Sequence, residues 1–181
     1  MDTTHCRNVR TSKAAPVIRG LLLVLLAVAG IARASAQDDT LLKFRGGIGV
    51  IPVTGVAASG AVNLNIVRGV SPAGPWRIAD LEGNVGSDGT VRIKGRGLLL
   101  AAGNGIGTNA GASVFATLFC GSPGAPTAHD SSRVALDADG DFRIEGVLSP
   151  NLPGACDTPV LLIRNAAGSG VWFAAGIPES K

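Results

Sequence analysis

The sequence predicts an all-β protein, an antiparallel β-sandwich or barrel of about eight to nine strands. Three observations lead to this prediction. Short stretches of alternating apolar and polar residues are separated by turns that contain Pro, Gly or Asp. Glycine is abundant, with 26 in 181 residues, and glycine disfavours long helices. No amphipathic helical period of useful length follows the N-terminal region.

The first 36 residues have the layout of a secretory signal peptide. Basic residues precede the apolar run Leu21–Ala32, and the small-residue motif Ala34-Ser35-Ala36 follows it. This run is shorter than the roughly 20 residues that span a bilayer. We therefore expect a signal-peptide helix within residues 1–36 and a single all-β domain over 37–181, without a transmembrane segment after cleavage. Cleavage after Ala34 and an uncleaved membrane anchor are the alternatives.

The basic character of the chain comes from this leader. The leader has five basic residues and one acid, a net charge of +4, and the whole chain has +3. The mature chain would therefore carry 3 − 4 = −1. A nucleic-acid-binding domain needs a basic mature surface, so this class of partner is not expected. Export would place the protein in the periplasm or outside the cell.

The cysteines predict one cross-link. Cys6 falls in the leader, so the mature chain retains Cys120 and Cys156. An exported location permits disulfides, and two cysteines allow one intramolecular pairing. We expect this disulfide to form, and two separate buried thiols are the alternative. A zinc site is disfavoured because His129 is the only mature histidine and zinc usually takes four ligands.

A unit of roughly fifty residues occurs twice, at an offset of 51. The matching segments are residues 71–75 with 122–126, 88–89 with 139–140, and 91–93 with 142–144. Each unit, over roughly 62–112 and 113–164, would place a Ser-Pro turn before an Asp-Gly hairpin. The sequence therefore predicts an internal pseudo-repeat.

The first strands are expected to be short and irregular. Within residues 38–53, Gly46-Gly47 interrupts the apolar pattern, and Pro52 favours a sheet edge. Strands are then expected at 62–70 and 76–85. The second of these should contain a bulge, because Asp80-Leu81 breaks its alternation.

Residues 90–100 alternate most clearly. Val91, Ile93 and Gly95 would face inward, and Arg92, Lys94 and Arg96 outward, as in a half-buried antiparallel strand. Residues 113–120 are instead apolar on both faces, which favours a central position in the sheet. The remaining strands are expected at 132–137, 141–148, 159–164 and 170–176.

Two features are candidate ligand contacts. Arg92, Lys94 and Arg96 share one strand face and could meet an anionic envelope glycan or lipid headgroup, although a solvated outer face is the stronger interpretation. Trp172 would be a stacking platform or a contact with a protein partner if it is exposed, and a core residue if it is covered. No residue pattern indicates a cofactor.

Two sets of residues could support hydrolysis. His129 stands beside Asp130, but neighbours in one loop rarely converge as a catalytic triad. Asp80 and Glu82 could act as paired carboxylates on one strand face, or pair with nearby arginines.

Two further motifs resemble known binding loops. Asp137, Asp139 and Asp141 resemble part of a calcium loop, but the Gly and Glu positions do not match it. Residues 103–107 read Gly-x-Gly-x-Gly, which fails the spacing of the dinucleotide fingerprint.

The segments Trp76–Leu100, Val114–Cys120 and Val171–Gly176 resemble a loosely related set of small exported bacterial proteins of unknown function. The shared features are a Trp-led hairpin, a strand ending in Cys and a closing Trp-Phe strand. The resemblance implies an exported all-β protein and brings no activity or site residue.

The leading hypothesis is therefore an exported non-catalytic β-domain with a binding or structural role at the cell envelope or outside the cell. The alternatives are a secreted hydrolase that uses His129 or the Asp80/Glu82 pair, and a calcium-stabilised adhesive module.

Overall fold

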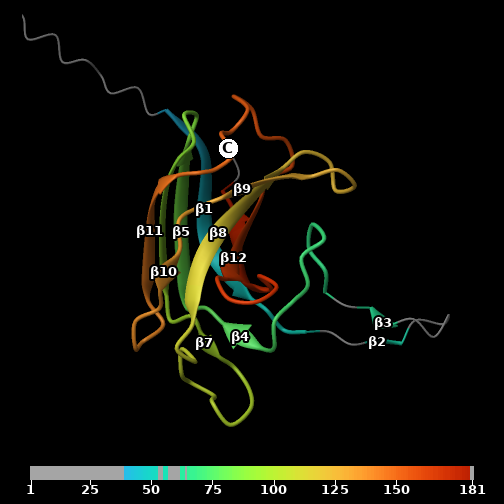
Figure 1. The fold of residues 1–181 in the computed structure, drawn as a ribbon, viewed down its shortest axis with the longest axis vertical. Coiled ribbons are helices and arrows are strands. Elements are labelled where there is room, and N and C mark those ends of the chain that lie inside the picture. The colour runs from blue at the N-terminus through green and yellow to red at the C-terminus, as the bar shows by residue number, and fades with distance from the viewer. Residues whose placement is uncertain (1–38, 53–54, 57–61, 64, 180–181) are drawn as a thin grey trace, which may run out of the picture. The chain divides into compact units, whose positions relative to one another are not determined.

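The computed structural model describes residues 39–52, 55–56, 62–63 and 65–179 (Figure 1). Over these residues the chain forms β-strands and no helix, and the strand pairings between them are antiparallel apart from one isolated bridge. The predicted all-β antiparallel class is confirmed. The expected signal peptide lies outside the described residues. A search of the described part for a helix long and apolar enough to cross a membrane finds none.

Nine strands form the main sheet, and two pairs of short strands form two small ones. The strands are β1 (Thr40–Gly49), β2 (Gly55–Val56), β3 (Val62–Asn63), β4 (Trp76–Arg77), β5 (Asp80–Gly86), β6 (Thr90–Arg96), β7 (Leu99–Leu100), β8 (Ser113–Cys120), β9 (Thr127–Asp130), β10 (Val134–Ala135), β11 (Phe142–Val147), β12 (Val160–Asn165) and β13 (Trp172–Pro178).

The main sheet runs in the order β10-β8-β12-β13-β1-β5-β6-β11. β9 and β10 pair with successive parts of the same edge of β8, so together they act as one interrupted edge strand. The sheet curls strongly (Figure 1). Its two edges meet where Asp130 and Ser149 exchange two backbone hydrogen bonds of 2.8 and 2.9 Å.

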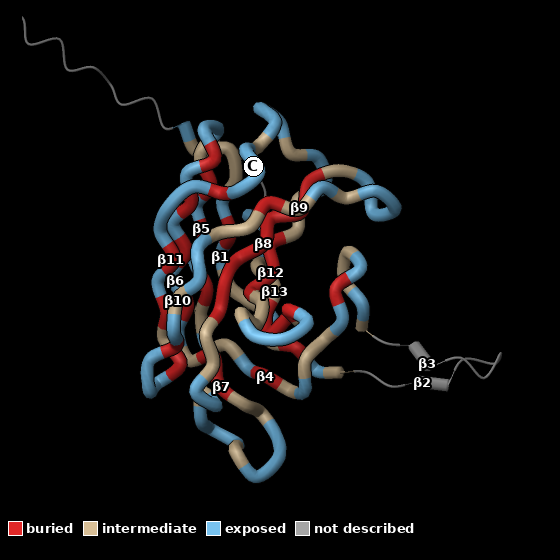
Figure 2. Tube along the Cα trace, viewed as in Figure 1, coloured by how far each residue is buried: buried red, intermediate tan, exposed pale blue. Residues whose placement is uncertain are grey.

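The core lies on the inner face of the curled sheet (Figure 2). Along β6, Val91 and Ile93 are buried while Arg92, Lys94 and Arg96 are exposed, as the alternation predicts. β8 has neighbours on both sides and is buried from residue 114 to residue 120, as its two-sided apolar sequence predicts. Each large apolar side chain that becomes buried contributes about 1.5–3 kcal/mol to folding.

The two strands that share the repeated sequence are direct neighbours. β6 and β11 pair so that Ile93 faces Ile144, its own equivalent at the offset of 51. Glycine faces a larger residue on both sides of this pair: Gly95 lies opposite Phe142, and Gly146 lies opposite Val91. A Cβ on Gly95 would overlap the Phe142 ring, so the glycine makes room for that ring. The pairing of the two strands is therefore symmetric about the Ile93–Ile144 pair, because the equivalents of Gly95 and Phe142 also face each other.

The expected strand over residues 76–85 is divided between two sheets. β4 pairs with β7, and β5 pairs with β6. The interruption lies opposite Gly97-Leu98, whose backbone N–H groups donate to Asp141 Oδ1 and the Gly140 carbonyl at 2.9 Å each. Because the second Asp-Gly turn takes these two donors, they are not free to extend the β5–β6 ladder.

Cys120 and Cys156 form the predicted disulfide, which joins the end of β8 to the loop before β12. Arg68 ties a third segment to the same place. Its guanidinium donates to the carbonyls of Gly121 and Thr158 at 3.0 and 2.6 Å. These contacts hold Arg68 near β8 and β12, and Ala73 at the end of the same segment lines the groove described next.

Candidate ligand-binding groove

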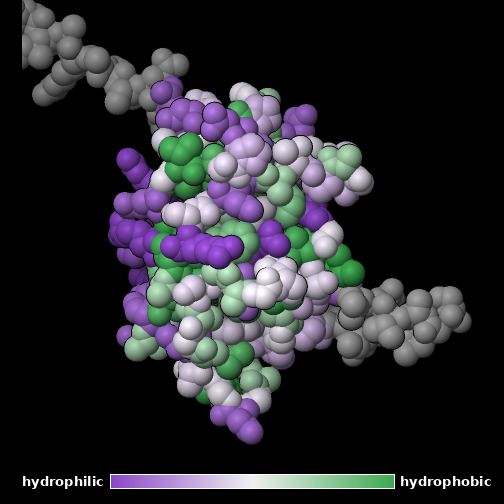
Figure 3. All heavy atoms as spheres, in the orientation of Figure 1, coloured by the Kyte–Doolittle hydropathy of each residue, from purple (hydrophilic) through white to green (hydrophobic). Residues whose placement is uncertain are grey.

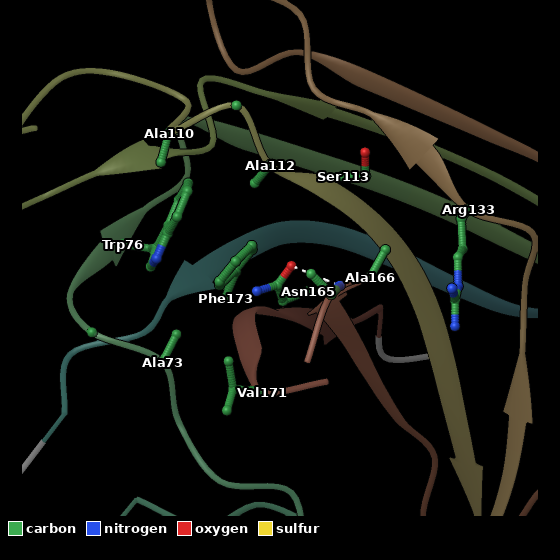
Figure 4. A pocket seen from close by; sticks show the side chains of 13 residues that line it. Ala73, Trp76, Ala110, Ala112, Ser113, Arg133, Asn165, Ala166, Val171 and Phe173 are labelled. Carbon is green, nitrogen blue, oxygen red and sulfur yellow. Dashed lines mark hydrogen bonds between the residues drawn. The ribbon is translucent and has the colours of Figure 1, made fainter. Parts of the chain in front are cut away.

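An open groove of about 710 Å³ lies beside the start of β8 (Figure 4). Its walls come from segments that are far apart in the sequence: Ala73, Gly74 and Trp76, residues 110–113, Arg133, residues 165–167, and Val171 and Phe173. Its volume is within the range of about 300–1,000 Å³ that is typical of small-molecule sites. The groove is therefore large enough to hold an organic ligand.

Two stacked aromatic rings form part of the groove. The centroids of Trp76 and Phe173 lie 4.1 Å apart, with their planes inclined by 21°. Val50 fixes this pair through the backbone. The Trp76 N–H donates to the Val50 carbonyl, and the Val50 N–H donates to the Phe173 carbonyl, each at 2.8 Å. The rings are thus held in place before any ligand binds.

The indole N–H of Trp76 has no hydrogen-bond partner in the described part of the chain, although the residue is only 5% exposed. Among these residues, the one fully enclosed side-chain nitrogen or oxygen without a partner is His129 Nε2. The indole N–H of Trp76 is therefore not fully enclosed and can be reached by solvent. A buried ring with an accessible donor is typical of a surface that contacts a partly apolar ligand.

Three polar side chains line the groove, and each can donate hydrogen bonds: Ser113, Arg133 and Asn165. Asn165 Oδ1 accepts the N–H of Ala167 at 3.0 Å, while Nδ2 has no partner among the described residues. Arg133 is exposed and makes no hydrogen bond or ion pair within that part of the chain. No acidic side chain lines the groove.

A second guanidinium lies near the Arg133 end. The Arg133 and Arg164 groups lie 5.9 and 5.0 Å from the centroid of the Phe115 ring. Arg164 donates to the Thr117 hydroxyl at 3.2 Å, and that hydroxyl donates to Asp130 Oδ1 at 2.6 Å. Burial lowers the pKa of Arg164, and the charge of Asp130 partly offsets this effect. Two cations and one carboxylate therefore leave this end positive.

Trp172 is not a surface contact, so that part of the prediction is wrong. It is 3% exposed, and its indole N–H donates to the Asn65 carbonyl at 3.1 Å. The backbone of residues 71–73 pairs with that of Trp172. Trp172 is the core residue of the second interpretation. The tryptophan with an accessible N–H is Trp76, which sequence reasoning treated as the first residue of a strand.

Arg92, Lys94 and Arg96 lie on the exposed face of β6, and none of them lines the groove. Figure 3 shows hydrophilic residues gathered on the side where β5, β6 and β11 lie. Arg96 pairs with Asp80 at 2.6 Å. Arg92 and Lys94 form no hydrogen bond or ion pair with the described residues. These two cations are available to a ligand on the solvated outer face of β6, where both line a smaller hollow of about 210 Å³.

The Arg96–Asp80 pair gives a testable pKa. The hydrogen bond from Arg96 is the main cause that lowers the pKa of Asp80 below its usual value. The stabilisation from this group is therefore present above the usual carboxyl pKa and is lost as pH falls through the lowered one. We expect Arg96→Gln to raise the pKa of Asp80, as measured by ¹³C NMR titration. The pKa of Asp88, which the Thr90 hydroxyl lowers, is the internal control and should not change.

The candidate hydrolytic residues do not converge on a shared cavity in the described structure. His129 is 1% exposed, its Nδ1 lies 2.7 Å from the Pro150 carbonyl oxygen, and its Nε2 is enclosed without a partner. Asp130 points to the other face of β9, toward Thr117. Asp80 and Glu82 pair instead with Arg96 and Arg45. This geometry gives a substrate no route to the imidazole.

The Asp-rich turn uses its carboxylates locally. Asp137 Oδ1 accepts the N–H groups of Asp139 and Asp141 at 3.0 and 2.8 Å, and Asp141 Oδ1 accepts the N–H of Gly97. Within the described residues, no group of three or more His, Cys, Asp or Glu is arranged to hold a metal ion. The hydrogen bonds explain the acidic residues as acceptors that shape the turn.

The fold and the groove define the class of protein: an antiparallel β-domain with one disulfide and an open, donor-lined groove. Comparison of the chain with protein-family models, with curated proteins and with solved structures finds no match. The function is therefore argued from the groove itself.

Proposed function

We propose that the protein is an exported, non-catalytic binding protein that holds a ligand in the groove, at the cell envelope or outside the cell. The observation that carries this proposal is the groove itself. It combines a fixed Trp76–Phe173 pair with polar donors that have no partner in the described chain. Concave, mostly apolar sites with a few polar groups are the usual form of a ligand site.

The disulfide and the leader sequence support export. Disulfides persist in oxidising compartments, and the Cys120–Cys156 bond joins loops that Arg68 also contacts. The resemblance to small exported bacterial proteins agrees with this proposal. The exposed Arg92 and Lys94 would give the same domain a secondary contact with an anionic envelope glycan.

We also infer that the scaffold is a partly open barrel rather than a sandwich. The backbone bridge between Asp130 and Ser149 at the two sheet edges supports this inference. The pairing of Ile93 with Ile144 supports the internal pseudo-repeat in the strands that follow its two Asp-Gly turns. The expected second hairpin is wrong, because β10 and β11 on the two sides of that turn pair with β8 and β6 and not with each other. The Ser-Pro segments do not match in position: residues 71–75 lie beside Trp172, whereas 122–126 connect β8 to β9.

Export is tested with the full-length chain expressed in a bacterial host. We expect the exported protein to begin after Ala36 or Ala34, as measured by intact mass. We also expect Cys120 and Cys156 to resist alkylation until a reductant is added. Full-length protein in the cytoplasm in which Cys120 and Cys156 react without a reductant would contradict the proposal.

Groove binding is tested by NMR with ten-carbon amphiphiles that carry a neutral, cationic or anionic head group. At least one should shift backbone signals of Ala112, Ser113 and Ala166, which line the groove. Signals of β6 residues such as Thr90 serve as a distant reference. If no compound shifts the groove signals, the proposed function is wrong.

A further inference from the structure

We propose that the groove binds an amphipathic carboxylate, an organic acid with an apolar body and one carboxylate group. This inference rests on the proposed function and specifies the chemical class of its ligand. The carboxylate would lie at Arg133, and the apolar body would lie along Val171, Phe173 and Trp76.

The charge of the ligand follows from the polar groups of the groove. The side chains of Ser113, Arg133 and Asn165 all present donors, and no acid balances them. A cationic ligand would meet the unpaired Arg133 and the nearby Arg164 without a compensating carboxylate in the groove. An anion with acceptor oxygens complements this set.

The Arg133 guanidinium favours a carboxylate in particular. A guanidinium presents a planar fork of N–H donors that matches two carboxylate oxygens. Arg133 has no competing ion pair in the described part of the chain, and Arg164 is already engaged by Gly170 and Thr117. One free guanidinium neutralises one negative charge, which suits a monoanion better than a doubly charged phosphate.

The apolar body of the ligand follows from the rest of the groove. Apart from its three polar side chains, the groove is lined by Ala, Gly, Val, Trp and Phe residues. Figure 4 shows Arg133 at one end, Trp76 at the other, and Phe173 and Asn165 between them. The one charged side chain of the groove thus lies at the end away from Trp76 (Figure 4), so a ligand with a charged end and an apolar end fits it in one orientation.

Isothermal titration with decanoate, below its micelle-forming concentration, tests this inference. Decanoate should bind more tightly than decanol, than acetate and than decyltrimethylammonium. Arg133→Gln should weaken decanoate binding by about ten-fold or more, because a hydrogen bond to a charged group contributes about 1.5–3 kcal/mol. Arg143→Gln is the control, since Arg143 is also an exposed arginine but lies on β11, away from the groove, where it pairs with Glu145. It should leave decanoate binding unchanged.

The outcomes separate the two proposals. If decanol binds as tightly as decanoate, or if Arg133→Gln has no effect while the variant keeps the wild-type melting temperature, the carboxylate inference is wrong and groove binding stands. If decyltrimethylammonium binds best, the charge argument is reversed and the inference is overturned. If none of the compounds binds and no groove signal shifts, both the inference and the proposed function fail.

Discussion

Removal of the Cys120–Cys156 disulfide is expected to lower the free energy of unfolding by about 3–4 kcal/mol. The bond closes a loop with a sequence separation of 36 residues, and in the chain-entropy model this closure restricts the unfolded chain. In the Cys120→Ser/Cys156→Ser double variant, neither position keeps an unpaired thiol. Urea unfolding of the oxidised wild type and of the double variant measures the difference.

A reductant provides the control for this experiment. Dithiothreitol should destabilise the wild type toward the level of the double variant and leave the variant itself unchanged. A loss below about 1 kcal/mol would mean that native contacts, such as those of Arg68 with Gly121 and Thr158, hold these loops without the covalent bond. Ligand binding in the groove should change little. The groove is lined by Ser113, the first residue of β8, whereas Cys120 is the last residue of that strand.

Gly140→Ala is expected to destabilise the protein by about 2–4 kcal/mol. Two effects add at this residue. Its φ of +78° is unfavourable for a side chain, and a new Cβ would overlap the backbone O, C and N atoms of Leu98. The Leu98 N–H also donates to the Gly140 carbonyl at 2.9 Å, so the clash would disturb the contact that joins the second Asp-Gly turn to the residue before β7. Chemical unfolding measures the loss.

Gly89→Ala is a matched control, because Gly89 occupies the same position in the first Asp-Gly turn. Its φ is +83°, but the nearest atom to an added Cβ is Val147 Cγ1 at 3.6 Å, an ordinary contact. We expect a cost of about 1–2 kcal/mol, which isolates the backbone term. Equal losses for the two variants would show that Leu98 moves aside and that the close packing of the second turn contributes nothing.

The strands that the sequence predicts correctly are those whose residue pattern follows directly from how many of their faces are buried. β6 alternates because one face is buried and the other is solvated, and β8 is apolar throughout because it is covered on both faces. The sequence predicts no strand at β9, because its four residues form a strand only by pairing with the edge of β8. The sequence predicts an irregularity at Asp80-Leu81, whereas the structure divides the strand at residues 78–79. The difference arises because the opposite residues, Gly97 and Leu98, donate hydrogen bonds to a turn that is distant in the sequence.

The groove could not be predicted in the same way. It combines Trp76, Ser113, Arg133, Asn165 and Phe173, which belong to five separate segments. None of these residues forms a motif with its sequence neighbours. The sequence places Arg133 in an expected strand over 132–137. Whether its guanidinium forms an ion pair depends on which acidic residues the fold brings near it. Conversely, His129 and Asp130 are neighbours in the sequence but do not act together as hydrolytic residues, because their side chains point to opposite faces of β9.

The two tryptophans allow the most direct test of ligand binding in the groove. Trp76 lines the groove with an indole N–H that has no partner among the described residues, whereas the Trp172 N–H is bound to the Asn65 carbonyl. In a ¹H–¹⁵N spectrum the two indole signals are assigned with Trp76→Phe. Addition of decanoate is expected to shift the Trp76 signal in a saturable manner and to leave the Trp172 signal in place. An unchanged Trp76 signal at saturating decanoate, or equal shifts of both signals, would contradict ligand binding in the groove.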